Sequence, residues 1–281
     1  MRTIGKVFIA AGVAVAIAAH PGAAYAGPFI LAGTDADDHG SASATANLQG
    51  WLFMQRSIES LAPAVVNGSK VVVSLGGTST ALAAKQSAFT FSNLASQGWT
   101  FQSLSGATAI NNFFLNSGSV TAATTGIIML DSGNNVTGGL GTSEEAALTA
   151  NAMPLNNFLG AGGGLFSQAN SYGFLSTLVP GASAPGESQT GITLTAAGSG
   201  AFPGLTNADL SAGPYHERFA NFGAIPVLGV GASSGNPIII GASGGSIIAP
   251  TPGPSPVPEP ATLLVMGAAL AGLGALRRKK A

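Results

Sequence analysis

The acidic stretch GTDADDHG contains side chains that could bind a metal ion. Asp35, Asp37 and Asp38 lie within four residues, and His39 follows them. Carboxylates this close repel one another unless a cation or a donor lies among them, and Ca²⁺ binds about six to eight oxygen ligands. The spacing is not that of an EF-hand, because Ala46 stands where the bidentate Glu would be. Two interpretations stay open: a Ca²⁺-binding loop, or a solvated loop in which Asp35 or Asp38 caps a helix.

A second group of residues could support hydrolysis. Ser167, Asp131 and His216 are the side-chain types of a nucleophile, an acid and a general base, and Glu217 directly follows His216. Geometry rather than chain order defines a catalytic triad, so their separation along the chain does not exclude one. A serine hydrolase and a structural role for these residues are both open.

Glycine-rich segments give weaker signals. The pattern G-x-S-x-G occurs at residues 231–235 and 241–245. A nucleophile elbow needs a helix after its Ser, whereas a Gly-Asn-Pro turn signal begins two residues after Ser233, and further glycines follow Ser243. The glycine triplet at residues 162–164 lacks the Lys and Ser/Thr of a phosphate-binding loop. We therefore predict that these glycines allow other parts of the chain to pack closely against the backbone where a helix leads into a strand.

The elements that must position these residues alternate between strands and helices. Apolar runs predict strands at residues 29–33, 70–75, 99–104, 126–131, 165–167, 192–195, 226–230 and 237–240. Amphipathic or capped segments predict helices at residues 48–66, 88–96, 107–115, 142–159 (kinked at Pro154) and 171–178. This alternation predicts an α/β fold: a doubly wound, largely parallel sheet with helices on both faces. Ligands of such sheets bind beyond the carboxyl ends of the strands, where Asp35, Asp131 and Ser167 are expected.

The N-terminal 26 residues have the pattern of a signal peptide. Arg2 and Lys6 form a short basic region, residues 7–19 are apolar, and Ala24 and Ala26 flank Tyr25 in a small-x-small cleavage site. We therefore expect an N-terminal signal helix, export by the general secretion machinery, and cleavage by signal peptidase before Gly27. The core is then residues 27–248.

The C-terminal end has three parts in a fixed order. After a proline-rich linker at residues 249–257 comes the tripeptide Pro258-Glu259-Pro260, then an uncharged run at residues 261–276, then four bases, Arg277, Arg278, Lys279 and Lys280. As a helix the uncharged run would be roughly 24 Å long, slightly short for a bilayer core of about 30 Å. The bases are expected to stay in the cytoplasm. The sequence thus predicts a weak C-terminal membrane helix on an exported protein.

This order at residues 258–281 resembles the PEP-CTERM sorting tail of Gram-negative bacteria. The resemblance implies that exosortase, a membrane protease-transpeptidase, recognises and removes the tail after a transient stay in the inner membrane. It also implies delivery to the cell surface, the outer envelope or the extracellular polysaccharide matrix. The same tail is catalogued as an ice-binding protein C-terminal domain, but no evenly spaced Thr rows support ice binding. An ordinary C-terminal membrane anchor is the alternative.

Composition restricts the partners of the core. Residues 27–248 contain four bases and ten acids, a formal net charge of −6. This charge gives no electrostatic footprint for nucleic acid and disfavours anionic lipid. The chain has no Cys, which excludes disulfides and thiolate zinc sites. The core is long enough to bury one hydrophobic interior without such cross-links.

A second resemblance concerns the core. Ile30-Leu31-Ala32-Gly33, VVVSLGG at residues 71–77, GIIMLDS at residues 126–132 and the glycines at 162–164 are similar to a class I glutamine-amidotransferase-like, flavodoxin-type domain. The resemblance implies a fold over about residues 29–240. The nucleophilic Cys of that superfamily has no counterpart near Ser167, so no catalytic role is implied.

Three functional hypotheses result. The leading one is an exported surface protein with a non-catalytic binding or structural core and no cofactor except the candidate Ca²⁺. The second is a surface hydrolase or metal-assisted carbohydrate-active enzyme, which requires Asp35, Asp37, Asp131, Ser167 and His216 to gather in one site. The third is a polysaccharide-binding module that stacks sugar on Trp51, Trp99 or Tyr215.

Overall fold

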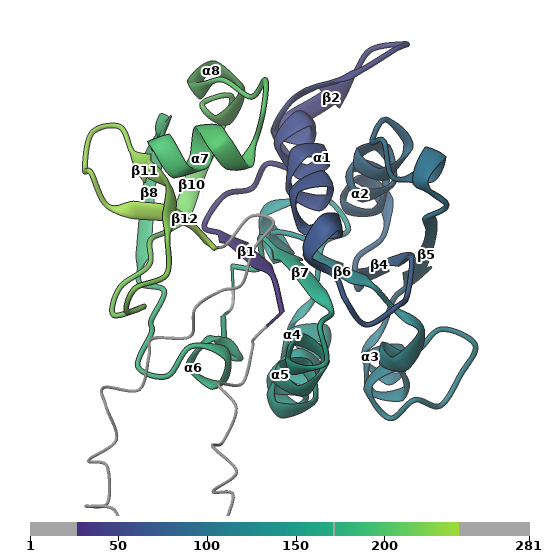
Figure 1. Ribbon diagram of the computed structural model, residues 1–281. Coiled ribbons are helices and arrows are strands. Elements are labelled where there is room, and N and C mark those ends of the chain that lie inside the picture. The colour runs from purple at the N-terminus through teal and green to yellow at the C-terminus, as the bar shows by residue number, and fades with distance from the viewer. Residues whose placement is uncertain (1–26, 171, 242–281) are drawn as a thin grey trace, which may run out of the picture.

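The computed structural model describes residues 27–170 and 172–241, which form an eight-stranded mixed sheet between two layers of helices (Figure 1). The strand order is β5-β4-β6-β7-β1-β12-β11-β9. These strands are β1 (Phe29–Ala32), β4 (Val71–Leu75), β5 (Thr100–Leu104), β6 (Ile127–Leu130), β7 (Gly164–Ser167), β9 (Ile192–Leu194), β11 (Val227–Gly231) and β12 (Pro237–Gly241). The predicted α/β fold with helices on both faces is confirmed.

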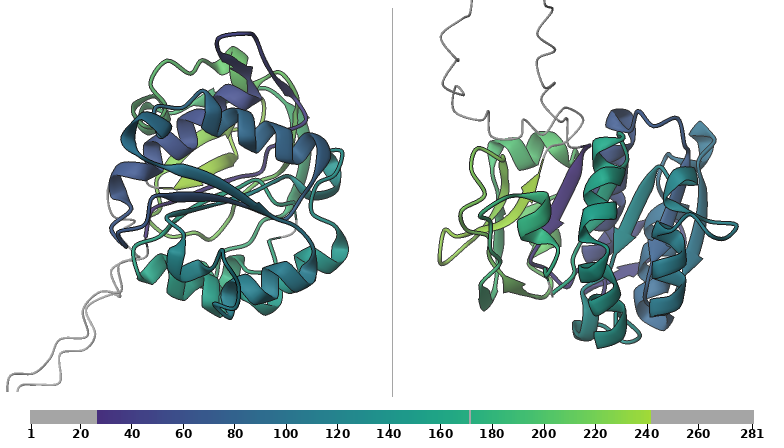
Figure 2. Two further views of the ribbon diagram at one scale, coloured as in Figure 1. Left: turned by 90° about the vertical axis from the view of Figure 1, so that its right-hand side faces the viewer. Right: turned by 90° about the horizontal axis from the view of Figure 1, so that it is seen from below.

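Alternating side chains of the buried strands build one core on each face of the sheet. Leu31 and Ile128 point toward one face, whereas Ile30 and Met129 point toward the other. The first face is covered by α3 (Ala107–Phe114), α4 (Thr142–Ala150), α5 (Ala152–Gly160) and α6 (Leu175–Leu178). The second is covered by α1 (Gly50–Leu61), α2 (Ser79–Thr90), α7 (Ala196–Ala201) and α8 (Asn207–Leu210) (Figure 2). Burial on both faces explains why β1, β4 and β6 read as continuous apolar runs.

The sheet is less parallel than the sequence predicts. β5, β4, β6, β7 and β1 are parallel to one another. β12 pairs antiparallel with β1, β11 with β12, and β9 with β11. Two further antiparallel pairs stand outside this sheet: β2 (Gly40–Ala42) with β3 (Asn47–Gln49), and β8 (Gly186–Thr190) with β10 (Pro214–Glu217). The largely parallel arrangement therefore holds only for the first five sheet strands along the chain. Among the later strands, β11 and β12 are joined by a short turn, which permits only antiparallel pairing.

The strand order also departs from the flavodoxin type that the resemblance implies. A flavodoxin-type sheet has the order 2-1-3-4-5, so its first strand lies inside the sheet. In this protein β4 to β7 follow the pattern 2-1-3-4, and the N-terminal strand β1 occupies the fifth position beside β7. The parallel half is thus a circularly permuted version of that order.

Several predicted helices have different bounds. Residues 88–96 are not one helix, because α2 begins at Ser79 and ends at Thr90. The helix expected at residues 142–159 is two helices that meet at Asn151 rather than one kinked at Pro154. Pro154 stands in the first turn of α5, where a missing N–H costs no intrahelical hydrogen bond. Of the segment at residues 171–178, only α6 is helical among the described residues.

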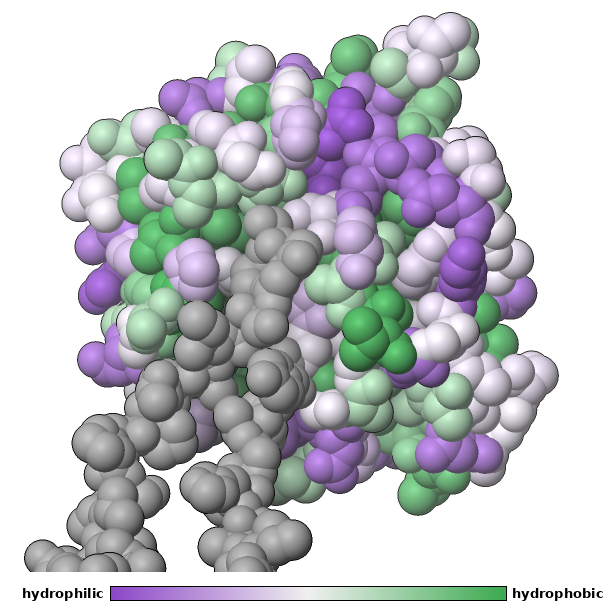
Figure 3. All heavy atoms as spheres, viewed as in Figure 1, coloured by the Kyte–Doolittle hydropathy of each residue, from purple (hydrophilic) through white to green (hydrophobic). Residues whose placement is uncertain are grey.

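Few charged residues cover the surface of the molecule. Figure 3 shows pale and green residues over much of one face, with the largest group of strongly hydrophilic residues over α1 and α2 and others scattered along the left and lower edges. In residues 27–170 and 172–241, no helix combines the length and the apolar character needed to cross a bilayer. The expected signal helix and cleavage site, the linker, the sorting tripeptide, the membrane helix at 261–276 and the four bases lie outside the described residues.

Candidate functional site at the strand ends

The loops that follow β1, β6 and β7 meet at the carboxyl edge of the parallel strands. Asp37 Oδ2 accepts a hydrogen bond from the backbone N–H of Ser132 at 2.9 Å. Gln168 Oε1 accepts hydrogen bonds from Thr34 Oγ1 and from the backbone N–H of Ala36, each at 2.9 Å. All of these residues are buried. The expectation that polar side chains converge at this edge is confirmed for these three loops.

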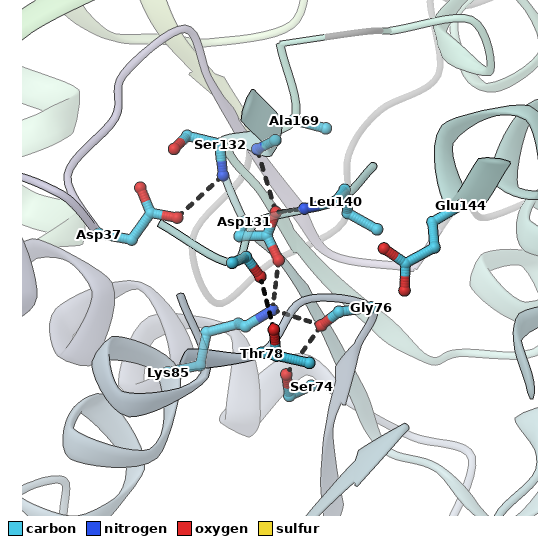
Figure 4. A network of polar contacts seen from close by, with 12 residues as sticks. Asp37, Ser74, Gly76, Thr78, Lys85, Asp131, Ser132, Leu140, Glu144 and Ala169 are labelled. Carbon is cyan, nitrogen blue, oxygen red and sulfur yellow. Dashed lines mark hydrogen bonds and ion pairs between the residues drawn. The ribbon is translucent and has the colours of Figure 1, made fainter. Parts of the chain in front are cut away.

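A buried ion pair connects α2 to the end of β6. Lys85 Nζ donates to Asp131 Oδ2 at 2.7 Å and to the carbonyl oxygen of Gly76 at 2.9 Å (Figure 4). Asp131 Oδ1 accepts from the backbone N–H groups of Gly133 at 3.0 Å and Leu140 at 2.7 Å. Both charged side chains are 0% exposed. The Asp131 carboxylate is therefore fully used in holding the loop after β6 against α2 and the turn after β4, which is a structural role.

Two other carboxyl groups near this edge hold their protons more tightly than usual. Burial is the main cause that raises the pKa of Asp37 from 3.8 to about 6. Burial likewise raises the pKa of Glu217, at the end of β10, from 4.5 to about 8, and the negative charge of Glu145 adds to the rise. At neutral pH Glu217 is therefore mostly protonated and can act as a hydrogen-bond donor.

Buried polar atoms without partners mark the same edge. Within the described residues, Asp37 Oδ1, Ser132 Oγ, Gln168 Nε2 and Glu217 Oε2 have no hydrogen-bond partner. Buried polar atoms are normally satisfied by protein or ordered water, so unpaired ones indicate where water or a polar ligand group would bind. They come from four segments far apart in the sequence and include both acceptors and a donor.

A second polar cluster lies beside this edge, where β10 approaches the loop after β1. Asp35 Oδ2 is 3.1 Å from His216 Nε2 and 3.2 Å from His39 Nε2. Asp38 Oδ2 is 3.6 Å from His39 Nε2. Burial raises the pKa of Asp35, while the hydrogen bond from His216 and the charges of both histidines act against that rise. Asp37 does not join this cluster, since its carboxylate points to Ser132.

The predicted serine-hydrolase triad does not assemble. Ser167 is fully buried, and its Oγ accepts a hydrogen bond from the backbone N–H of Ala169 at 3.3 Å. His216 contacts Asp35 instead of Ser167, and Asp131 contacts Lys85. The five residues that the hydrolase hypothesis needs in one site are divided between two clusters and a buried strand end.

The aromatic residues proposed to stack on sugar are occupied by the fold. Trp99 and Tyr215 are 7% and 0% exposed. Trp51 is half-buried, and its Nε1 donates to the backbone carbonyl of Asp37 at 2.9 Å. Tyr215 Oη donates to Glu187 Oε1 at 3.1 Å. These three rings do not form an exposed stacking platform.

The glycine-rich motifs have structural roles in the described part of the chain. Ser233 lies in the exposed turn between β11 and β12, so its G-x-S-x-G match is no nucleophile elbow. Ser243 lies outside the described residues. Gly163 packs against the ring of Phe158, where a Cβ atom would come within 2.2 Å, as close backbone approach predicts.

Sequence reasoning missed two residues of this edge. Lys85 was available as one of only four bases in the core, and it follows Ala84 in an alanine-rich segment. A cation among small apolar residues of a helix is a signal for a buried partner. Glu217 was noted only as the neighbour of His216; its burial depends on the position of β10 relative to β1, which no local pattern reveals.

The fold and the two clusters thus define an α/β domain with polar loops gathered at one sheet edge. Comparison with known families identifies one further feature: residues 256–279 match the PEP-CTERM protein-sorting motif. Neither the curated proteins nor the solved structures that were compared include a significant match to the chain. The sorting motif supports an exported surface protein whose processing partner is exosortase. The expected likeness of the core to glutamine amidotransferases receives no support from these comparisons.

Proposed function

We propose that this protein is an exported precursor whose C-terminal segment, residues 258–281, is recognised by exosortase, so that the core is displayed at the cell surface or in the surrounding polysaccharide. The observation that carries the proposal is the match of residues 256–279 to the PEP-CTERM protein-sorting motif. Residues 1–26 act as a cleaved signal peptide, and residues 261–276 hold the precursor in the inner membrane until processing.

The position of the core's two ends supports display of the strand-end edge. β12 runs antiparallel to β1 with Gly241 opposite Ile30, so the described chain begins and ends at the same side of the sheet. The polar loops after β1, β6 and β7 lie at the opposite edge, since parallel strands share their direction. A core tethered through the segment after Gly241 therefore turns this polar edge away from its attachment point.

We propose a non-catalytic binding or structural role for the core itself. Ser167 is buried away from His216, and Asp131 is occupied by Lys85 and two backbone N–H groups. The polar edge instead offers unpaired donors and acceptors, which suits binding of a polar ligand better than nucleophilic attack.

Removal of the sorting segment tests the proposal. An epitope inserted in the exposed turn at residues 43–46, between β2 and β3, allows detection without touching either core cluster. In an exosortase-containing host, the full chain is expected to yield a shortened surface product, whereas deletion of residues 258–281 abolishes surface display. A matched variant with Ala at Pro258, Glu259 and Pro260 keeps the membrane segment and should accumulate unprocessed in the membrane. Unchanged surface display after the deletion would show that sorting does not depend on this segment.

A further inference from the structure

Two imidazoles and two carboxylates gather beside the carboxyl edge of the sheet, and nothing in the proposed sorting function requires them. We propose that Asp35, Asp38, His39 and His216 form a binding site for a divalent transition-metal ion, with Zn²⁺ as the preferred occupant. Three of these residues follow β1, and the fourth comes from β10, 181 positions along the chain from Asp35.

Three of the six distances between the donor atoms are close to the edges of a metal tetrahedron. Zn²⁺ lies about 2.0–2.2 Å from imidazole nitrogen and carboxylate oxygen, which separates two ligands of a tetrahedral site by about 3.3–3.6 Å. The donor atom of Asp35 is 3.2 Å from that of His39 and 3.1 Å from that of His216, while His39 and Asp38 are 3.6 Å apart. The donor atoms of Asp35, Asp38 and His39 all lie within 4.8 Å of one another. His216 is close to Asp35 but is not part of that group, so its ring would move toward Asp38 and His39 when all four side chains coordinate one ion.

The donor set favours zinc over the calcium expected from the acidic loop. Ca²⁺ prefers six to eight oxygen ligands, about as many as three carboxylates with carbonyl groups would supply. Asp37, the third carboxylate of that loop, is instead turned toward Ser132. Two imidazole nitrogens replace it, and imidazole is a ligand for zinc, copper, nickel and iron rather than for calcium.

The backbone holds the four ligands in place. The N–H of His216 donates to the carbonyl oxygen of Gly33 at 2.7 Å, and the N–H groups of Asp38 and His39 turn back onto the carbonyl oxygen of Asp35. The His39 ring packs against Gly213, where a Cβ atom would come within 2.1 Å of it. This glycine therefore leaves the space that the imidazole occupies.

The cluster is also accessible to an ion. The side chains of His39 and His216 are 35% and 28% exposed, whereas that of Asp35 is 4% exposed. A hollow of about 10 Å³ beside Asp35 and His39 has room for about one water molecule. A bound ion would connect the loop after β1 to β10, a cross-link that this cysteine-free chain cannot make with disulfides.

Metal titration of the full chain in detergent, after dialysis against a chelator, tests the proposal. ZnCl₂ is expected to bind with a stoichiometry of one per chain by calorimetry. At about 100 times the dissociation constant it should raise the melting temperature by about 5–10 °C. CaCl₂ should do neither. Co²⁺ in place of Zn²⁺ should give the intense visible absorption of a tetrahedral ion.

Variants identify the ligands. His39→Ala, on the partly exposed loop, and His216→Gln, which keeps the size of the side chain, should each weaken Zn²⁺ binding at least tenfold. Asp37→Asn is the matched control: it changes a carboxylate of the same loop that points away from the cluster, and it should bind Zn²⁺ like the unaltered protein. The proposal is overturned if both histidine variants bind Zn²⁺ as tightly as the unaltered protein. It is also overturned if Ca²⁺ stabilises the chain and Asp37→Asn abolishes that effect.

Discussion

Replacing Lys85 with Met is expected to destabilise the protein strongly, because it leaves the Asp131 carboxylate buried without its cation. Both side chains are 0% exposed, and their charged atoms are 2.7 Å apart. Removing one partner of a buried ion pair costs roughly 3–5 kcal/mol. The backbone N–H groups of Gly133 and Leu140 still donate to Asp131, so we expect a loss near the lower value, about 3 kcal/mol.

The double variant Lys85→Met/Asp131→Asn separates the ion pair from the loop contacts. Asn retains a carbonyl oxygen for the N–H groups of Gly133 and Leu140 and carries no charge. Replacement of a buried ion pair by neutral groups of similar volume is often close to neutral, so the double variant should lose only about 1–2 kcal/mol. It should thus be more stable than Lys85→Met alone, although it carries one more substitution.

Urea unfolding followed by circular dichroism gives the free energies for this comparison. Lys70→Met is the matched control, since it makes the same chemical change at an exposed lysine that donates to the carbonyl of Gln97. Its effect should stay within about 0.5 kcal/mol. A loss below about 1 kcal/mol for Lys85→Met would refute the reasoning, as would a double variant whose loss equals the sum of the two single losses.

Two further predictions concern the pH dependence and the core. The pKa of Glu217 in the folded protein is raised from 4.5 to about 8. The contribution of its protonated form to stability is therefore present at low pH and is lost as the pH rises toward 8. Between about pH 5 and pH 7, the contribution of this group to the free energy of unfolding should fall by roughly 2–3 kcal/mol. In urea titrations at several pH values, Glu217→Gln should remove this pH dependence and Glu217→Asp should retain it. An unchanged pH dependence in Glu217→Gln would contradict the prediction. Phe53 is fully buried edge-on against Phe166 and Phe202, with ring centroids 5.6 Å and 5.3 Å away. Phe53→Ala should cost about 3–5 kcal/mol and Phe53→Leu less than half as much by the same assay, because Leu retains much of the buried volume. Equal losses in the two variants would contradict this reasoning.

The sequence predicts well those elements in which consecutive apolar residues indicate burial. The runs VVVSL and IIML form β4 and β6 as expected, since strands covered on both faces need apolar side chains at every position. The failures occur where the local pattern is weak. α2 consists mainly of small residues and turns Lys85 inward, so neither its start at Ser79 nor its end at Thr90 stands out.

The location of the candidate site was predictable from the sequence, but the contacts between its side chains were not. Alternation of strands and helices implies that the polar residues after β1, β6 and β7 meet at one edge, and Asp37, Ser132 and Gln168 do. Which carboxylate faces which partner was not predictable. Asp35 and Asp37 are two residues apart, yet one contacts His216 and the other Ser132, because the turn between them points their side chains in different directions.

The sequence by itself determined the sorting signal at the C-terminus and the alternation of elements that gives an α/β core. These features depend on residue types and spacings within short segments, so they can be read without coordinates. Only the tertiary structure decided that β1 lies beside β7 and β12, that Lys85 is buried against Asp131, and that His216 completes a cluster around Asp35. Strand order and such pairings depend on contacts between segments that are distant along the chain. Their free energies depend on burial and orientation, which exist only once the chain has folded.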